Sequence, residues 1–215
     1  ELIPAMGCTE PIALAYAAAV ARKTLGEMPD KVVVEASGSI IKNVKSVIVP
    51  NTGHLKGINA AAAAGIVAGD PDKKLEVIAT VSQEQIRQMK QFMEEVPIQV
   101  VHMEDGCTFD IIVTVFSGKS YAKVRIANFH TNIVLIEKNG EVLKSEAVSD
   151  DSEEGLTDRT LLDMEHIWDF AMTADIDDVK ALLDQQVAFN VAIAEEGIKN
   201  DYGANIGRTL LRAYG

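Results

Sequence analysis

The sequence predicts an α+β fold, in which a mixed β-sheet with packed helices is followed by a helical segment. Alanine-rich apolar segments with capping and stop residues indicate helices in the first half of the chain. Short β-branched segments separated by turn residues indicate strands in the middle. Apolar residues at helical spacing dominate the last part. A length of 215 residues allows one domain or two small ones.

The first predicted helix runs from Thr9 to about Leu25. Thr9 caps it, Pro11 is tolerated in its first turn, and Gly26 ends it. A further helix is predicted over 83–95, because Ser82 and the glutamine three residues later have the spacing of a capping box. The other elements predicted in this half are strands at 31–37, 43–49 and 75–81 and a helix at 57–68.

A β-rich run fills the middle of the chain. Its predicted strands cover 98–102, 109–116, 121–127, 132–137 and 141–144. Asn139-Gly140 is typical of a tight hairpin, because both residues adopt positive φ readily, and it joins the last two strands. Together with the preceding helices, this run makes up a first predicted domain, residues 1–148.

An acidic segment marks the predicted domain boundary. Residues 146–169 contain nine acidic residues and one basic residue, a charge of −8 out of the −12 of the whole chain. Within this segment, 149–155 is predicted to be an exposed linker. The second domain, 156–215, is predicted to be helical. Its apolar stripe, expected to be core, consists of Leu161, Met164, Trp168 and Met172.

Composition excludes several classes of function. A net charge of −12 gives no overall attraction to nucleic acid or to an anionic membrane surface. No apolar run reaches the length of about 20 residues that a membrane-spanning helix needs. Two cysteines are too few for a disulfide framework and fit a reduced, cytoplasmic protein.

Cys8 is the most informative single residue. It comes just before a predicted helix, whose N-terminal N–H groups and dipole favour a thiolate and lower the pKa of the thiol. Such a cysteine is a nucleophile, a metal or cluster ligand, or a small buried apolar residue, and the last alternative carries about half the weight. Cys107, at a junction between a loop and a strand, is expected to be structural.

Two polar segments offer further candidate sites. The loop Pro50–Gly57 joins an extended segment to a helix, and its backbone N–H groups with Lys56 suit a small carboxylate, although an ordinary polar turn is slightly favoured. His130 precedes a strand and is either an acid–base group or a hydrogen-bonded histidine at a strand end. The four histidines lack the spacing of metal ligands, so a zinc site is not expected.

The first residues, Glu-Leu-Ile-Pro-Ala-Met-Gly-Cys-Thr-Glu-Pro, resemble the N-terminal signature of the iron–sulfur-dependent L-cysteine desulfidase family. That family is related to the alpha chain of iron–sulfur L-serine dehydratases. The resemblance covers nearly the whole chain, and its further matching segments are 38–44, 50–57, 130–136 and 192–197.

The resemblance implies a lyase that converts L-cysteine to pyruvate, ammonia and hydrogen sulfide, or L-serine to pyruvate and ammonia. It implies a [4Fe-4S] cluster in the full-length protein, with Cys8 as a ligand, and one iron free to act as a Lewis acid. The residues that it implies for the amino-acid pocket are Asn43, Asn51, Thr52, Gly53, Lys56, His130, Thr131 and Asn132. Its candidates for the catalytic base are His54, Lys56 and His130.

Length is where the chain departs from this family. Members are roughly twice as long, and their other cluster cysteines lie in the C-terminal half. The resemblance therefore implies that 156–215 is the start of a larger helical catalytic domain that is absent from this chain. The chain is therefore expected to be a fragment, without a bound cluster and inactive by itself, because Cys8 and Cys107 cannot supply the thiolates of a four-iron cluster. The alternatives are a non-catalytic module for amino-acid or anion binding or for oligomerisation, and a structural part of a hetero-oligomer. A homo-oligomer is also compatible with the alanine-rich helices.

Overall fold

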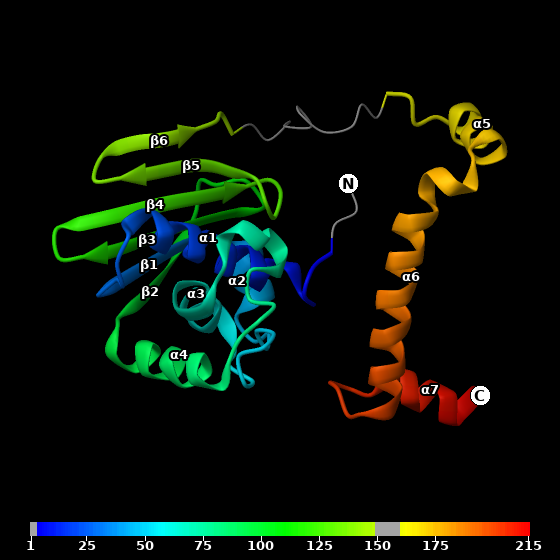
Figure 1. The fold of residues 1–215 in the computed structure, drawn as a ribbon, viewed down its shortest axis with the longest axis horizontal. Coiled ribbons are helices and arrows are strands. Elements are labelled where there is room, and N and C mark those ends of the chain that lie inside the picture. The colour runs from blue at the N-terminus through cyan, green and yellow to red at the C-terminus, as the bar shows by residue number, and fades with distance from the viewer. Residues whose placement is uncertain (1–3, 149–159) are drawn as a thin grey trace. The chain divides into compact units, whose positions relative to one another are not determined.

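The computed structural model describes residues 4–148 and 160–215, in which the chain forms two compact units (Figure 1). Among the described residues, one unit takes in 4–148 and the other 160–215. We call the described residues 4–148 the sheet unit and the described residues 160–215 the helical unit, and each is described by itself. The predicted linker at 149–155 lies outside the described residues.

The sheet unit alternates helices and strands before a run of antiparallel strands. Its elements are α1 (Thr9–Leu25), β1 (Lys31–Ser37), α2 (Gly38–Val44), α3 (Gly57–Ala68), the 3-10 helix η1 (Pro71–Glu76), α4 (Gln83–Glu95), β2 (Ile98–Met103), β3 (Asp110–Ser117), β4 (Ser120–Ala127), β5 (Ile133–Lys138) and β6 (Glu141–Ser145). The predicted capping box at Ser82 is present, and Gly26 ends α1 with a φ of 93°.

The strands form one mixed sheet in the order β2-β1-β3-β4-β5-β6 (Figure 1). β1 and β2 are parallel, and every other neighbouring pair is antiparallel. The parallel pair needs a long crossover, which α2, α3, η1 and α4 supply. Asn139 and Gly140 both have positive φ and join β5 to β6, as predicted. The α+β class with a mixed sheet is thereby confirmed.

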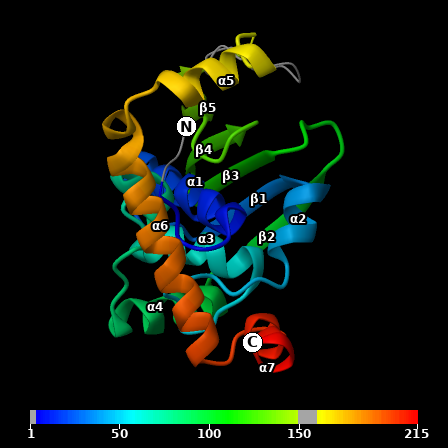
Figure 2. The ribbon, with the colours of Figure 1, turned by 90° about the vertical axis from the view of Figure 1, so that its right-hand side faces the viewer.

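Helices are layered on one face of this sheet. α1 packs on β3 and β4, α3 packs on α1, and α4 packs on α3 (Figure 1, Figure 2). α1 is therefore covered from two sides, and its residues from Ile12 to Ala18 are almost completely buried. The two alanine-rich helices approach so closely that a Cβ on Gly65 of α3 would lie 2.0 Å from the carbonyl oxygen of Ala15 in α1. Only glycine fits there.

The opposite face of the sheet carries no helix of this unit. Alternation along β1 turns Val32 and Val34 into the core and Val33 and Glu35 to this second face. A shallow groove of about 340 Å³ runs over it and is lined by Val33, Glu35, Val101, Thr114, Phe116, Tyr121 and Lys123.

Two predicted strands of the first half are wrong. Residues 43–44 end α2, and the rest of the segment forms a turn and one isolated antiparallel bridge between Ile48 and Lys56 instead of a strand, because Ser37 caps α2 by accepting the N–H of Ile40 and so starts a helix early. Residues 75–81 begin inside the 3-10 helix η1, which Asp70 caps by accepting the N–H of Asp72, and continue as a turn. The apolar residues of that segment are buried without forming a strand, which shows that a short apolar run marks burial more reliably than extended backbone.

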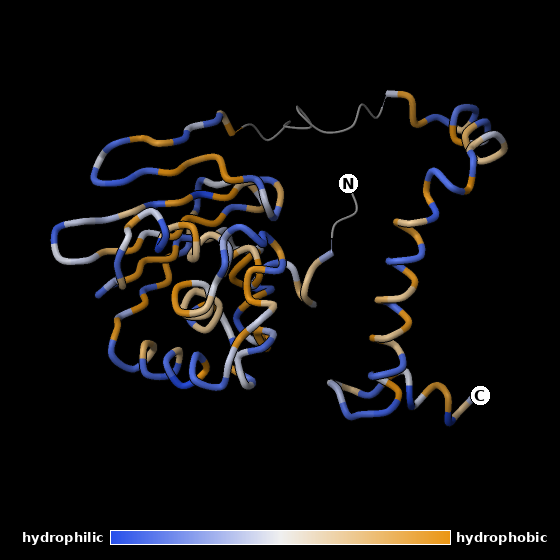
Figure 3. The backbone as a smooth tube through the Cα atoms, viewed as in Figure 1, coloured by the Kyte–Doolittle hydropathy of each residue, from blue (hydrophilic) through white to orange (hydrophobic). Residues whose placement is uncertain are grey.

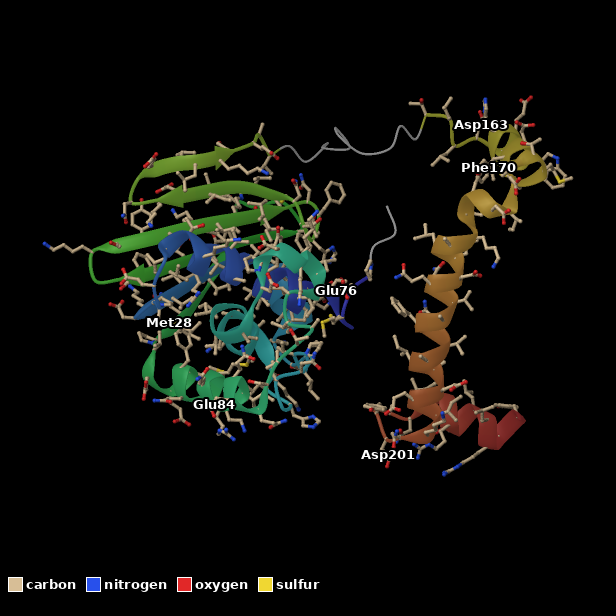
Figure 4. All side chains as sticks on the ribbon, in the orientation of Figure 1. Met28, Glu76, Glu84, Asp163, Phe170 and Asp201 are labelled. Atoms are coloured by element: carbon tan, nitrogen blue, oxygen red, sulfur yellow. The ribbon has the colours of Figure 1, made fainter. Side chains whose placement is uncertain are left out.

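The helical unit consists of α5 (Met164–Thr173), α6 (Ile176–Lys199) and α7 (Ile206–Tyr214). Asp163 and Asp175 cap the first two helices through their side chains. None of these helices contains a buried residue, so the stripe predicted to be core is exposed, Trp168 by 67%. Figure 4 shows the side chains of α5, including Phe170, standing away from the helix. Among the described residues, no helix is long and apolar enough to cross a membrane.

Candidate functional site

The candidate site begins at the N-terminus of α1. Cys8, not Thr9, is the N-cap residue, and it makes no side-chain capping bond. Its thiol instead donates a hydrogen bond to Oε2 of Glu10, at 3.1 Å from Sγ. Glu10 lies in the first turn of the helix, where the dipole stabilises a negative charge. The helix start therefore holds a thiol and a carboxylate in direct contact.

Asn43 joins this pair from a second helix. Its Nδ2 donates to Oε1 of Glu10 at 3.3 Å, so each carboxylate oxygen accepts one bond from a neutral donor. Asn43 lies near the end of α2, which follows β1 directly because Ser37 caps it. The early helix start that the sequence did not predict is therefore what brings Asn43 to Glu10.

The expected activation of the Cys8 thiol is wrong. Burial raises its pKa, and the hydrogen bond to Glu10 and the negative charge of that carboxylate raise it further. The N–H of Glu10, at the helix N-terminus, lowers it as expected, but this effect is the smaller one. Cys8 is accordingly a protonated donor here rather than a thiolate.

The pKa of Glu10 shifts in the opposite direction to that of Cys8. Burial acts to raise its pKa, but hydrogen bonds from the Cys8 thiol, from its own N–H and from Asn43, together with the charge of His130, outweigh it. The pKa of Glu10 is lowered as a result. The carboxylate is therefore ionised at neutral pH although it is partly buried.

His130 is the third predicted site residue at this cluster. Its ring packs on Phe109, with 4.4 Å between the ring centroids, and its Nε2 is buried without a hydrogen-bond partner. Burial lowers the pKa of His130, and the charge of Glu10 offsets this only in part. The imidazole is therefore neutral at neutral pH and can accept a proton.

A buried ion pair supports the loops on which His130 and Phe109 lie. Arg125 of β4 forms two bonds to Asp110 of β3, at 2.9 and 2.6 Å, and Asp110 is completely buried. Asp110 also accepts the backbone N–H of Cys107, whose thiol donates to the carbonyl of Phe109 at 2.9 Å. Cys107 is thus structural, as expected.

Asn132 closes the loop between β4 and β5 that carries His130. Its Nδ2 donates to the carbonyl of Ala127, and its backbone carbonyl accepts the N–H of the same residue. Thr131, also expected in the pocket, is half-buried and contributes its carbonyl to the N–H of Ile133. Asn132 therefore shapes the loop with its amide.

In the loop Pro50–Gly57, two predicted substrate ligands are used within the fold. The amide of Asn51 donates to the carbonyls of Ile78 and Ala79, and the buried hydroxyl of Thr52 donates to the carbonyl of Val49. The N–H of Gly57 donates to the carbonyl of Val47 rather than pointing to an open anion site. The loop is held mainly by its own polar groups.

The other site residues predicted in this loop are Gly53, His54 and Lys56. His54 and Lys56 are exposed, and no hydrogen bond or ion pair between described residues joins either side chain to Glu10. Gly53 has a φ of 66°, and a Cβ on it would lie 3.1 Å from Ile86. The loop still borders the site, because a Cβ on Gly7 would lie 3.6 Å from the ring of Pro50.

We name the resulting set the Glu10 cluster: Cys8, Glu10, Asn43 and His130. Three of its members were predicted from the sequence, and Glu10, at its centre, was not. Among the described residues, no hydrogen bond or ion pair joins Asn51, Thr52, Gly53, His54 or Lys56 to this cluster. Phe109, Asp110 and Arg125, which support it, carried no local signal in the sequence.

The described residues do not fit a complete ligand set for a four-iron cluster. No group of three or more His, Cys, Asp or Glu side chains among them is placed to hold a metal ion. Cys107 belongs to a small apolar cluster with Ala127 and Val134, and its pKa is raised by burial. Cys8 is therefore the one thiol at the Glu10 cluster.

Comparison with known proteins gives relatives but no activity. No family model matches the chain. It is 54% identical over 215 residues to a UPF0597 protein of Desulfitobacterium hafniense and 45% identical over 215 residues to one of Lachnoclostridium phytofermentans. These matches take in all of this chain and 50% and 51% of the relatives. The chain thus spans about half the length of the curated relatives it matches, and it is similar to UPF0597 proteins throughout.

Proposed function

We propose that the full-length protein is an ammonia-releasing lyase that converts L-cysteine to pyruvate, ammonia and hydrogen sulfide, or L-serine to pyruvate and ammonia. This chain supplies part of its amino-acid pocket. The observation that supports the proposal is the Glu10 cluster: a carboxylate accepts hydrogen bonds from a thiol and an amide, and His130, with a buried and unpaired Nε2, lies near enough for its charge to affect Glu10.

His130 is the base of the proposed reaction. Its neutral imidazole accepts the α-proton at Nε2, the electrons of the Cα–H bond form a double bond between Cα and Cβ, and the Cβ–S or Cβ–O bond breaks. The aminoacrylate that remains becomes an imine, and water converts it to pyruvate and ammonia. His54 and Lys56 are not supported in this role, because both are exposed and, unlike His130, neither is among the charges that affect Glu10.

Cys8 is proposed as one ligand of a [4Fe-4S] cluster whose other ligands lie outside this chain. Such a cluster supplies a Lewis acid for the departing sulfur or oxygen. Ligation requires loss of the thiol proton, which Cys8 donates to Glu10 in a hydrogen bond in this structure. Metal binding by Cys8 and that hydrogen bond therefore exclude each other. A cytoplasmic location belongs to the same proposal, because both cysteines are free thiols.

The test uses the full-length protein, purified without oxygen, with pyruvate and sulfide release from L-cysteine as the readout. His130→Asn should lower kcat by about 10²- to 10⁴-fold, the usual contribution of a general base. His54→Asn, the same substitution on an exposed histidine, should stay within about twofold. Equal losses in both variants would remove His130 as the base, and no turnover of either amino acid would refute the lyase proposal.

A further inference from the structure

The proposed base, His130, is oriented without a hydrogen bond in the described part of the chain. No hydrogen bond between described residues includes its imidazole, and its Nε2 is buried without a partner. A histidine that acts as a base is usually held in one orientation by a hydrogen bond at its second ring nitrogen. Here the imidazole must instead be held by packing.

Phe109 supplies that packing. The centroids of the two rings are 4.4 Å apart and their planes are inclined at 55°, a tilted contact of the kind favoured between aromatic rings. Phe109 is partly buried and packs on the main hydrophobic core, so its ring is supported by the rest of the sheet unit. A phenyl ring offers no hydrogen-bonding atom, so it holds the imidazole without using either of its nitrogens.

The backbone fixes where the phenyl ring lies. Phe109 precedes β3 and Asn128 follows β4, and the N–H of Asn128 donates to the carbonyl of Phe109 at 2.9 Å, one step beyond the last residue pair of the two strands. The thiol of Cys107 donates to the same carbonyl at 2.9 Å. Two donors on one carbonyl, beside the fully buried Asp110, leave the backbone of Phe109 little freedom.

A bend at Asn128 brings the histidine to this ring. Asn128 has a φ of 66°, a left-handed conformation that asparagine adopts more readily than most residues, so the chain leaves the direction of β4 there. The N–H of Asn132 then donates to the carbonyl of Phe129 at 3.0 Å and closes a turn. His130 lies inside this turn, so its place against Phe109 is set by the backbone on both sides.

We infer that Phe109 is a positioning residue of the proposed reaction, which holds the imidazole of His130 in one orientation and keeps water from its Nε2. The inference rests on the proposed function and adds to it the residue that orients the base. Proton transfer needs the base within hydrogen-bond reach of the α-proton, and a displacement of about 1 Å can cost about 100-fold in rate. Because Phe109 acts through His130, its removal should slow proton transfer and leave substrate binding nearly unchanged.

The first experiment measures pyruvate release from L-cysteine by the full-length protein, purified without oxygen. Phe109→Ala should lower kcat by about 10- to 100-fold and change KM by less than about threefold. Phe109→Leu, which keeps an apolar side chain against the imidazole, should recover most of this loss. Phe129→Ala is the matched control and should leave kcat unchanged, because Phe129 adjoins His130 in the sequence but is 38% exposed.

A double-variant cycle separates positioning from a structural role. In His130→Asn no imidazole remains to be positioned, so adding Phe109→Ala should lower kcat no further. A residue that merely supports the fold would lower kcat by the same factor with and without His130.

A second measurement does not depend on turnover. The 215-residue chain contains four histidines, and NMR with isotope-labelled histidine separates their imidazole signals, with His130→Asn identifying the one of interest. The ring current of Phe109 should shift the imidazole protons of His130 away from the positions typical of an exposed histidine. Phe109→Ala should abolish this shift, and Phe129→Ala should preserve it.

The outcomes distinguish the two proposals. If the wild type turns over L-cysteine and Phe109→Ala matches it, or loses the same factor with and without His130, the positioning role is refuted and the lyase proposal stands. If the wild type turns over neither L-cysteine nor L-serine, the lyase proposal is refuted and the role of Phe109 falls with it. Where Phe109→Ala fails to fold, the lack of a ring-current shift in the wild type would still overturn the inference.

Discussion

The two units contain helices of similar composition with opposite surroundings. In α1, eleven of 17 residues are buried, between the sheet on one side and α3 on the other. In α6, none of 24 residues is buried, although apolar residues recur along its whole length (Figure 3). A helix that is apolar on several sides is typical of a protein interior.

The comparison teaches that an apolar pattern predicts a helix without predicting what covers it. α1 is covered within its own unit, because α3 packs on one side of it and strands β3 and β4 pack on the other. The three helices of the helical unit contain no buried residue, so none of them is covered in this way. Since the relatives are about twice as long as this chain, we expect α6 to be covered in the full-length protein.

The largest expected effect comes from separating the units. Residues 1–148 alone should unfold cooperatively in urea, because their core is formed within the sheet unit. Residues 156–215 alone should show weak helicity and a broad transition, because isolated helices without tertiary packing are marginal in water. Circular dichroism at 222 nm measures both. A sharp transition for 156–215, with light scattering showing a monomer, would contradict the expectation that these helices have no core of their own.

The next effect concerns ion pairs in the two units. Asp110→Ala should destabilise the sheet unit by about 3–5 kcal/mol, because it leaves Arg125 without its partner beside a buried site. Asp184→Ala removes an exposed pair with Lys180 on α6 and should cost at most about 0.5 kcal/mol. Urea midpoints of the whole chain give both values, and comparable losses would contradict the assignment of Asp110 to a buried pair.

Two glycines allow the tightly packed helix α3 to be compared with the exposed helix α6. Gly65→Ala should cost about 3 kcal/mol, because the added methyl group collides with backbone of α1. Gly197→Ala meets nothing within 4 Å and should instead raise the helicity of α6, as alanine is favoured over glycine by about 1 kcal/mol. Thermal melting and circular dichroism check the two signs. A neutral Gly65→Ala would show that α1 and α3 lie further apart.

The smallest expected effect is the pH dependence contributed by His130. Burial lowers its pKa in the folded chain, so between that value and the unfolded value of about 6.5 the unfolded chain binds more protons. Acidification through this window should therefore destabilise the fold. The stability lost between about pH 7.5 and pH 5.5 should shrink in His130→Asn. His166→Asn, at an exposed histidine of the helical unit, is the control, and an equal change in both variants would contradict the assignment.

Local signals predicted most of the fold. The ends of α1 and α4 and the hairpin at Asn139 follow from capping and turn residues close in sequence. The strand predicted at 43–49 failed because a cap at Ser37, six residues earlier, decides the backbone there. The strand at 75–81 failed because Leu75 belongs to a 3-10 helix and the buried residues Val77 and Ile78 lie in the turn after it.

The candidate site was predictable only in part. Cys8, Asn43 and His130 lie in segments that the resemblance singled out, but Glu10 was interpreted only as a helix-dipole residue. The pairing of β3 with β4 places Ile112 opposite Arg125, so Asp110 is its diagonal neighbour. That register, unlike the spacing in the sequence, is the signal that identifies the ion pair.

The close contact of α1 with α3 has a thermodynamic consequence. Alanine has no rotamers to lose, so burying the alanines of both helices requires no side-chain ordering. For the same reason a steric overlap at this contact cannot be removed by a change of rotamer, because a methyl group cannot rotate away from a neighbour. The interface should therefore form at low entropic cost and accept almost no enlargement where the two helices touch.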